Sequence, residues 1–107
     1  MSGYSSLFTG NALAEPAEKK SDKSVYRILM VDDEPNVLTS LRRIFRRENY
    51  YIETAMSGEE ALQILAKSDF QLIISDFKMP KMNGAEFLRR VKNLRPEIIR
   101  IMLMASY

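Results

Sequence analysis

Two apolar runs that each end in acidic residues constrain the fold of this chain more than any other feature. The run Leu72–Ser75 ends on Asp76. Further upstream, the run Leu29–Val31 ends on the pair Asp32 and Asp33. Ligands of an open parallel sheet bind beyond the carboxyl ends of its strands, where the direction of winding reverses. If these runs are neighbouring parallel strands, the three acids meet at one spot.

Three carboxylates at one spot predict a cation site. Such groups repel one another unless a cation lies between them, and their oxygen atoms suit a hard divalent ion. We therefore expect Asp32, Asp33 and Asp76 to bind Mg²⁺ or Mn²⁺. The alternative is that Asp32 or Asp33 caps a helix beginning at Pro35, while Asp76 forms a turn. The two interpretations are about equal for either site alone, but acids at both strand ends favour a joint site.

From Val25 onward, apolar runs alternate with segments of helical periodicity. This alternation predicts an α/β fold, a doubly wound parallel sheet with right-handed crossovers. The predicted strands are Tyr26–Val31, Tyr51–Ala55, Phe70–Ser75 and Ile98–Met104. The predicted helices begin at Pro35, after Ser57 with its capping partner Glu60, and after Asn83 with its capping partner Glu86.

The first predicted helix has an apolar and a basic face. Its apolar residues recur at helical spacing and are expected to pack on the sheet: Val37, Leu38, Leu41, Ile44 and Phe45. Arginines occupy the opposite face, where a solvated stripe is a better interpretation than a nucleic-acid patch: Arg42, Arg43, Arg46 and Arg47.

The composition excludes several kinds of chemistry. The 107 residues suit one domain, and 46% hydrophobic residues are enough to build a core. Without cysteine, the chain forms no disulfide and no cysteine-type zinc site. Without histidine, it cannot use histidine in acid–base catalysis or donate a phosphoryl group from phosphohistidine. A net charge of +2, with both signs interspersed, gives no argument for nucleic-acid binding.

The first 24 residues differ from the rest of the chain. They are rich in serine, alanine, glycine and lysine and have no sustained apolar period, so we expect residues 1–24 to be a mobile tail. No stretch of the sequence approaches the length needed to cross a membrane, and the pattern of a secretory signal peptide is missing. We expect a cytoplasmic protein that does not bind membranes.

The acid pair Asp32 and Asp33, then Asp76 and the loop Met79–Gly84, follow one another in an order that resembles the receiver domain of bacterial two-component response regulators. The resemblance implies a flavodoxin-like receiver fold for residues 25–107. It also implies a phosphoacceptor rather than an enzyme. Asp76 would accept the phosphoryl group from a sensor histidine kinase or a phosphotransfer protein.

The same resemblance implies roles for the residues around Asp76. Asp33, Asp76 and the backbone carbonyl of Lys78 would bind Mg²⁺ directly, and Asp32 would act through a metal-bound water. Receivers also place a threonine or serine at the end of the fourth strand, but here Met104 aligns with it. A thioether cannot donate a hydrogen bond. Ser106, two residues later, is a candidate substitute.

The resemblance stops before the family's last helix, strand and helix, and before the lysine that follows its fifth strand. We therefore expect an incomplete, C-terminally truncated βαβαβαβ fold. In such a fold, the apolar strand Ile98–Met104 would lie at an edge with little helical cover, and the chain would associate with itself through that strand.

Two other functions compete with phosphoryl acceptance. One is a degenerate or truncated receiver that dimerises or binds a protein without being phosphorylated. The other is a metal-dependent phosphohydrolase with an aspartyl nucleophile. Such enzymes need an acid two residues beyond the nucleophile, where this chain has Lys78, so this hypothesis ranks last.

Overall fold

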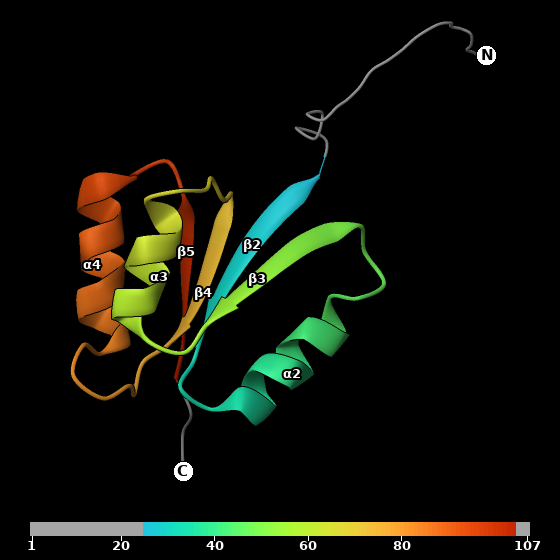
Figure 1. Ribbon diagram of the computed structural model, residues 1–107, viewed down its shortest axis with the longest axis horizontal. Helices are drawn as coiled ribbons and strands as arrows, with labels where there is room; N and C mark the ends of the chain where they lie inside the picture. The colour runs from blue at the N-terminus through green and yellow to red at the C-terminus, as the bar shows by residue number, and fades with distance from the viewer. Residues whose placement is uncertain (1–24, 105–107) are drawn as a thin grey trace, which may run out of the picture.

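The computed structural model describes residues 25–104, which form a four-stranded parallel sheet with helices on both faces (Figure 1). The strand order is β3-β2-β4-β5. The strands are β2 (Tyr26–Val31), β3 (Tyr50–Ala55), β4 (Leu72–Asp76) and β5 (Ile99–Leu103). The helices are α2 (Pro35–Ile44), α3 (Gly58–Leu65) and α4 (Gly84–Leu94). The predicted doubly wound βαβαβαβ fold, an incomplete flavodoxin-like receiver fold, is confirmed.

Two predictions fall outside the described residues: the mobile tail of residues 1–24 and the position of Ser106. Among the helices of residues 25–104, none has the length and apolar character needed to cross a membrane.

The helices begin where the sequence predicts. Pro35 opens α2, where its missing N–H leaves no hydrogen bond unmade. The Ser57 hydroxyl accepts a hydrogen bond from the Glu60 amide at 3.0 Å, and the Glu60 carboxylate accepts one from the Met56 amide at 2.8 Å. The Asn83 side chain accepts a hydrogen bond from the Glu86 amide at 2.9 Å and so caps α4. Side-chain caps thus mark the starts of α3 and α4, and a proline marks the start of α2.

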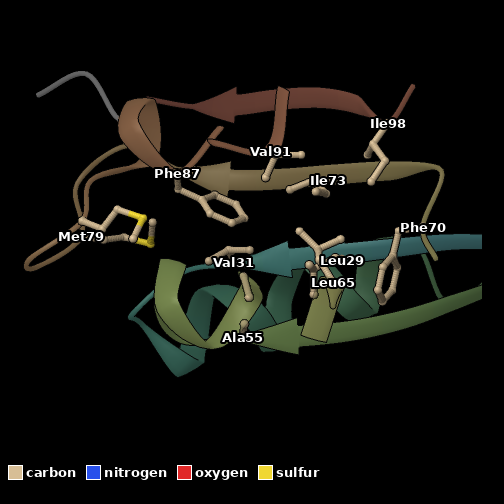
Figure 2. Packing of buried hydrophobic residues seen from close by; sticks show 12 residues of the cluster. Leu29, Val31, Ala55, Leu65, Phe70, Ile73, Met79, Phe87, Val91 and Ile98 are labelled. Carbon is tan, nitrogen blue, oxygen red and sulfur yellow. The ribbon is translucent and has the colours of Figure 1, made fainter. Parts of the chain in front are cut away.

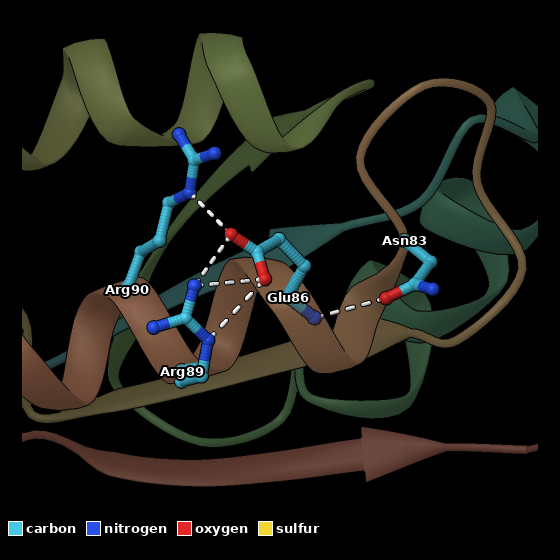
Figure 3. A network of polar contacts seen from close by, with 4 residues as sticks. All are labelled: Asn83, Glu86, Arg89 and Arg90. Atoms are coloured by element: carbon cyan, nitrogen blue, oxygen red, sulfur yellow. Dashed lines mark hydrogen bonds and ion pairs between the residues drawn. The ribbon is translucent and has the colours of Figure 1, made fainter.

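The first turn of α4 also carries a small ion-pair network (Figure 3). The Glu86 carboxylate lies 2.8 Å from the guanidinium of Arg90 and 2.7 Å from that of Arg89. Hydrogen bonds from Arg90 and Arg89 lower the pKa of Glu86. The network is exposed to solvent, so it orders the helix start and adds little to stability.

The larger core lies between the sheet and the helices α3 and α4 (Figure 2). Phe87 and Val91 of α4 are fully buried there, together with Leu29 and Ile73 from the sheet. The smaller core lies on the opposite face of the sheet, where Leu38 of α2 packs on strand residues. Because both faces of β2 and β4 are covered, those strands are apolar without alternation, as parallel strands usually are.

The apolar face predicted for α2 is wider than the face that packs on the sheet. Leu38 is buried, and Leu41 and Phe45 are partly buried against the smaller core. Val37 and Ile44, also expected to face the core, are 37% and 68% exposed. One α2 side chain is buried in the smaller core, whereas the apolar stripe of the helix extends beyond that contact.

Strand β5 is an edge strand with one bare face, as expected. Ile99 pairs with Leu72 and Ile101 with Ile74, so both β5 residues lie on the same side of the sheet as α2. They are 55% and 43% exposed, because α2 lies over β2 instead. Among the described residues, no element covers this part of the sheet.

Replacement of Gly84 tests how closely α4 approaches β4. A Cβ at Gly84 would overlap the Asp76 carbonyl oxygen and lie 3.0 Å from the Cα of Phe77, both backbone atoms. Gly84→Ala should therefore lower the free energy of unfolding by about 2 kcal/mol in urea denaturation. Gly58→Ala is the matched control, because its Cβ would meet the flexible Met82 sulfur at 2.8 Å and should cost less. An equal or smaller loss for Gly84→Ala would contradict this packing.

Candidate metal centre

Three carboxylates converge at the C-terminal edge of the sheet. Asp32 directly follows β2, and Asp76 is the last residue of β4; the two strands are paired, with Val31 opposite Ser75. One carboxylate oxygen from each of Asp32, Asp33 and Asp76 lies within 4.8 Å of the others. The convergence predicted from the two strand ends is therefore present.

Backbone hydrogen bonds hold these residues in place. The Asp32 amide donates to the Ala55 carbonyl at 3.1 Å, which ties the end of β2 to β3. The chain just after Asp76 is held from two sides. The Phe77 amide donates to the Leu103 carbonyl at 3.0 Å, and the Phe77 carbonyl accepts a bond from the Gly84 amide at 2.8 Å.

The helix-capping alternative for the acids has limited support. The N-cap residue of α2 is Glu34, and no side chain makes a capping hydrogen bond there. Asp32 Oδ1 accepts a hydrogen bond from the Glu34 amide at 2.9 Å, just outside the helix. One carboxylate oxygen of Asp32 thus orders the turn, which leaves the other for a ligand.

Asp32 is the buried member of the three acids. It is only 4% exposed. Burial raises its pKa, and the charges of Asp76, Asp33 and Glu34 raise it further, while the hydrogen bond from the Glu34 amide lowers it. A cation between the acids would offset this repulsion and favour the charged form of Asp32.

The donor set fits a small hard cation. Mg²⁺ binds oxygen atoms at about 2.1 Å, so two ligands on opposite sides of the ion lie about 4.2 Å apart. Carboxylate oxygen atoms of the three acids lie within 4.8 Å of one another, near enough to share one ion directly or through a bound water. All three groups offer oxygen atoms, which Mg²⁺ and Mn²⁺ prefer.

The acids line one side of a cavity of about 580 Å³. Glu34 and Lys78 also line it, and Met104 lies at its wall, where the sequence placed the switch position. The rest of the wall is apolar and was not predicted: Val37, Phe77 and Leu103. The only signal for that wall in the sequence was the position of Met104 at the end of a predicted strand.

Known proteins resemble this chain in sequence and in fold. Residues 28–107 match the family model of the response regulator receiver domain. The sporulation initiation phosphotransferase F of Bacillus subtilis is 37% identical over 81 residues, which cover 76% of this chain and 64% of that protein. The transcriptional regulatory protein GlrR of Escherichia coli is 35% identical over 78 residues, 73% of this chain but 18% of that protein.

Solved structures have a similar fold. The response regulator TrrA of Thermotoga maritima, in complex with Mg²⁺ and BeF, superposes with a TM-score of 0.73 at 36% identity, covering 77% of this chain and 71% of TrrA. A complex of the histidine kinase ThkA with TrrA gives a TM-score of 0.72 at 37% identity, covering 78% and 72%.

The parallel sheet, the acids at the ends of two adjacent strands and the family match together define a receiver-type signalling domain. The chain belongs to the response regulator receiver domain family. It spans less than two thirds of the length of the curated relatives above.

Replacement of Asp32 tests the cost of burying its charge beside the other acids. Because the folded pKa of Asp32 is raised, its ionisation destabilises the fold as pH rises from the ordinary carboxyl range through the folded pKa. Asp32→Asn should therefore raise the melting temperature at pH 7 in EDTA, and the gain should vanish in more acidic solution. The exposed acid Glu59 provides the control, because Glu59→Gln should show no such pH-dependent gain. A lower melting temperature for Asp32→Asn at pH 7 would contradict the destabilisation that we attribute to the Asp32 charge.

Proposed function

We propose that this chain is the phosphoacceptor module of a two-component relay, with Asp76 accepting a phosphoryl group from a histidine kinase or a phosphotransfer protein. The observation that carries the proposal is the convergence of Asp32, Asp33 and Asp76 on one cavity at paired strand ends. The relative TrrA, seen with Mg²⁺ and BeF and seen with a histidine kinase, supports the same assignment. The cytoplasm is the compartment where such a donor would meet it.

In this proposal Asp76 is the nucleophile. Its carboxylate oxygen attacks phosphorus in line with the donor's P–N bond, and that bond breaks with its electron pair left on the histidine nitrogen. Asp33, Asp76 and the Lys78 carbonyl would hold Mg²⁺, with Asp32 one water away. The ion, when bound, neutralises charge on the phosphoryl oxygens. The chain's own part is to fix the Asp76 carboxylate, through the bonds of Phe77 to its two neighbours.

We expect phosphorylation of Asp76 to cause only a small conformational change. Met104 lines the cavity but has no hydroxyl to bind a phosphoryl oxygen. A ligand shifts a two-state equilibrium only by its different affinity for the two states. Modification of Asp76 should therefore change the backbone little beyond the acids, unless Ser106 supplies the missing hydroxyl.

Metal binding should stabilise the fold. Free Mg²⁺ at ten times its dissociation constant should add about 1.4 kcal/mol to the free energy of unfolding, seen as a higher melting temperature. Asp33→Asn and Asp76→Asn should remove this response, whereas Asp69→Asn, at the opposite end of β4, should keep it. A melting temperature indifferent to millimolar Mg²⁺ would count against the metal centre.

Phosphorylation is tested by intact mass. With acetyl phosphate and Mg²⁺, the chain should gain the mass of one phosphoryl group, and Asp76→Asn should not. Asp69→Asn is again the control and should be modified normally. If the wild-type chain gains no mass with acetyl phosphate or with a phosphorylated histidine kinase, the proposed function is wrong.

The bare face of β5 favours a second candidate function, a module that binds a second copy of itself without phosphorylation. Ile99, Ile101 and Leu103 share one exposed apolar face on an edge strand. Exposed edges and apolar patches of this kind favour association. Two copies meeting through this face would bury it in a symmetric contact.

Sedimentation distinguishes this candidate. The wild-type chain should sediment as a dimer or larger species, and Ile101→Lys should shift it toward monomer because a charge would be buried in the contact. Leu94→Lys is the matched control, since Leu94 is 67% exposed at the end of α4, which packs on the opposite face of the sheet from Ile101. A wild-type monomer that melts cooperatively would rule out association.

A further inference from the structure

A buried hydroxyl lies directly beside Asp76 in the sequence. In residues 25–104, the polar or charged residues that are buried are Asp32 and Ser75. Asp32 belongs to the candidate metal centre, whereas Ser75 of β4 does not line the acid cavity. Ser75 is fully buried and is paired with Val31 of β2, a residue of the larger core. A hydroxyl in apolar surroundings costs free energy unless it makes a hydrogen bond, so packing alone would favour an apolar side chain here.

The Ser75 hydroxyl makes its hydrogen bond to the backbone of the next residue. It donates to the Asp76 carbonyl oxygen at 3.0 Å. The same peptide group is held at its other end, because the Phe77 amide donates to the Leu103 carbonyl at 3.0 Å. The peptide group is planar, so it cannot rotate without breaking one of these two bonds. A bond broken in a buried site is not replaced by water, which makes the rotation costly.

The close approach of α4 supports the same orientation. The Asp76 carbonyl oxygen lies so near Gly84 that a Cβ at Gly84 would overlap it. The Phe77 carbonyl accepts a hydrogen bond from the Gly84 amide at 2.8 Å. Three successive polar groups of the backbone after Asp76 are thus held in place. Backbone groups of β5 and α4 hold two of them, and the side chain of Ser75 holds the third.

We propose that Ser75 is a positioning residue whose hydroxyl fixes the peptide group between Asp76 and Phe77. Fixing this group sets the directions of the Asp76 carboxylate and of the Lys78 carbonyl two residues later. The inference rests on the proposed function, which assigns these two groups to the metal and the phosphoryl group, and adds to it a residue outside the cavity. A site that is ordered before its ligands arrive loses less conformational entropy when they bind. In-line attack also requires the carboxylate to lie in a narrow range of positions.

Substitution of Ser75 tests the role of its hydroxyl. With acetyl phosphate as donor, the Asp76 carboxylate oxygen bonds to phosphorus, and acetate leaves with the electron pair of the broken P–O bond. At saturating Mg²⁺, the rate constant for this modification should fall about fivefold in Ser75→Ala, the loss that corresponds to one net hydrogen bond. Ser75→Cys has nearly the same shape but a weak donor, so its rate constant should lie between those of wild type and Ser75→Ala.

Two further measurements do not depend on phosphorylation. In EDTA, the ¹³C NMR signal of the Asp76 carbonyl should move upfield in Ser75→Ala, because that carbonyl loses a hydrogen bond. The dissociation constant for Mn²⁺ should rise about threefold, since part of the binding free energy is then used to order the peptide group.

Ser57→Ala is the matched control. The Ser57 hydroxyl also makes a 3.0 Å hydrogen bond to the backbone, with the Glu60 amide, but it caps α3 and does not line the acid cavity. Ser57→Ala should lower the melting temperature through loss of the cap. It should keep the wild-type rate constant, the wild-type Mn²⁺ dissociation constant and the wild-type Asp76 carbonyl signal.

The possible outcomes separate the inference from the proposed function. A Ser75→Ala chain with the wild-type rate constant and the wild-type Mn²⁺ dissociation constant would overturn the inference and leave the proposed phosphorylation intact. An equal loss of rate in Ser57→Ala would also overturn it, because the rate would then follow stability and not the position of Asp76. If the wild-type chain is not modified at all, the proposed function is refuted. The Mn²⁺ dissociation constant and the Asp76 carbonyl signal then decide whether Ser75 positions the metal ligands.

Discussion

The convergence of Asp32, Asp33 and Asp76 at one edge of the sheet is the constraint on which the rest of the site depends. The sheet places the acids together because β2 and β4 are paired and end at the same level, with Val31 opposite Ser75. Burial is the main cause of the raised pKa of Asp32, and the charges of Asp76 and Asp33 raise that pKa further. A divalent ion between the acids would offset the repulsion of their charges, so the cluster is a candidate cation site.

Contacts from α4 and β5 fix the backbone next to Asp76. Gly84 lets α4 approach the backbone of Asp76 too closely for any side chain, and its amide fixes the Phe77 carbonyl. The Leu103 carbonyl holds the other side of the same peptide segment. The end of β5 therefore anchors the chain just after Asp76, and Leu103 also lines the acid cavity.

Much of this could be predicted from the sequence, because the determining signals are local. The side chains of Ser57 and Asn83 cap the helices that they precede, so the helix starts can be predicted from them. The two acidic strand ends likewise predict the candidate metal centre. The width of the α2 contact could not be predicted, because periodicity gives the direction of a helix face but not how far the sheet beneath it extends. Val37 and Ile44 were therefore wrongly assigned to the core. The roles of Val37 and Leu103 in the cavity depend on how α2 and β5 are placed in space, which no local pattern encodes.

The most direct test of the account is to locate a paramagnetic ion in the site. Substoichiometric Mn²⁺ should broaden the amide signals of Asp33, Asp76 and Lys78 first, because the carboxylates that bind the ion surround them. Signals at the opposite edge of the sheet, such as those of Asp69 and Arg95, should stay sharp, and Asp76→Asn should abolish the selective broadening. Uniform broadening along the chain, or broadening centred away from the ends of β2 and β4, would contradict the account.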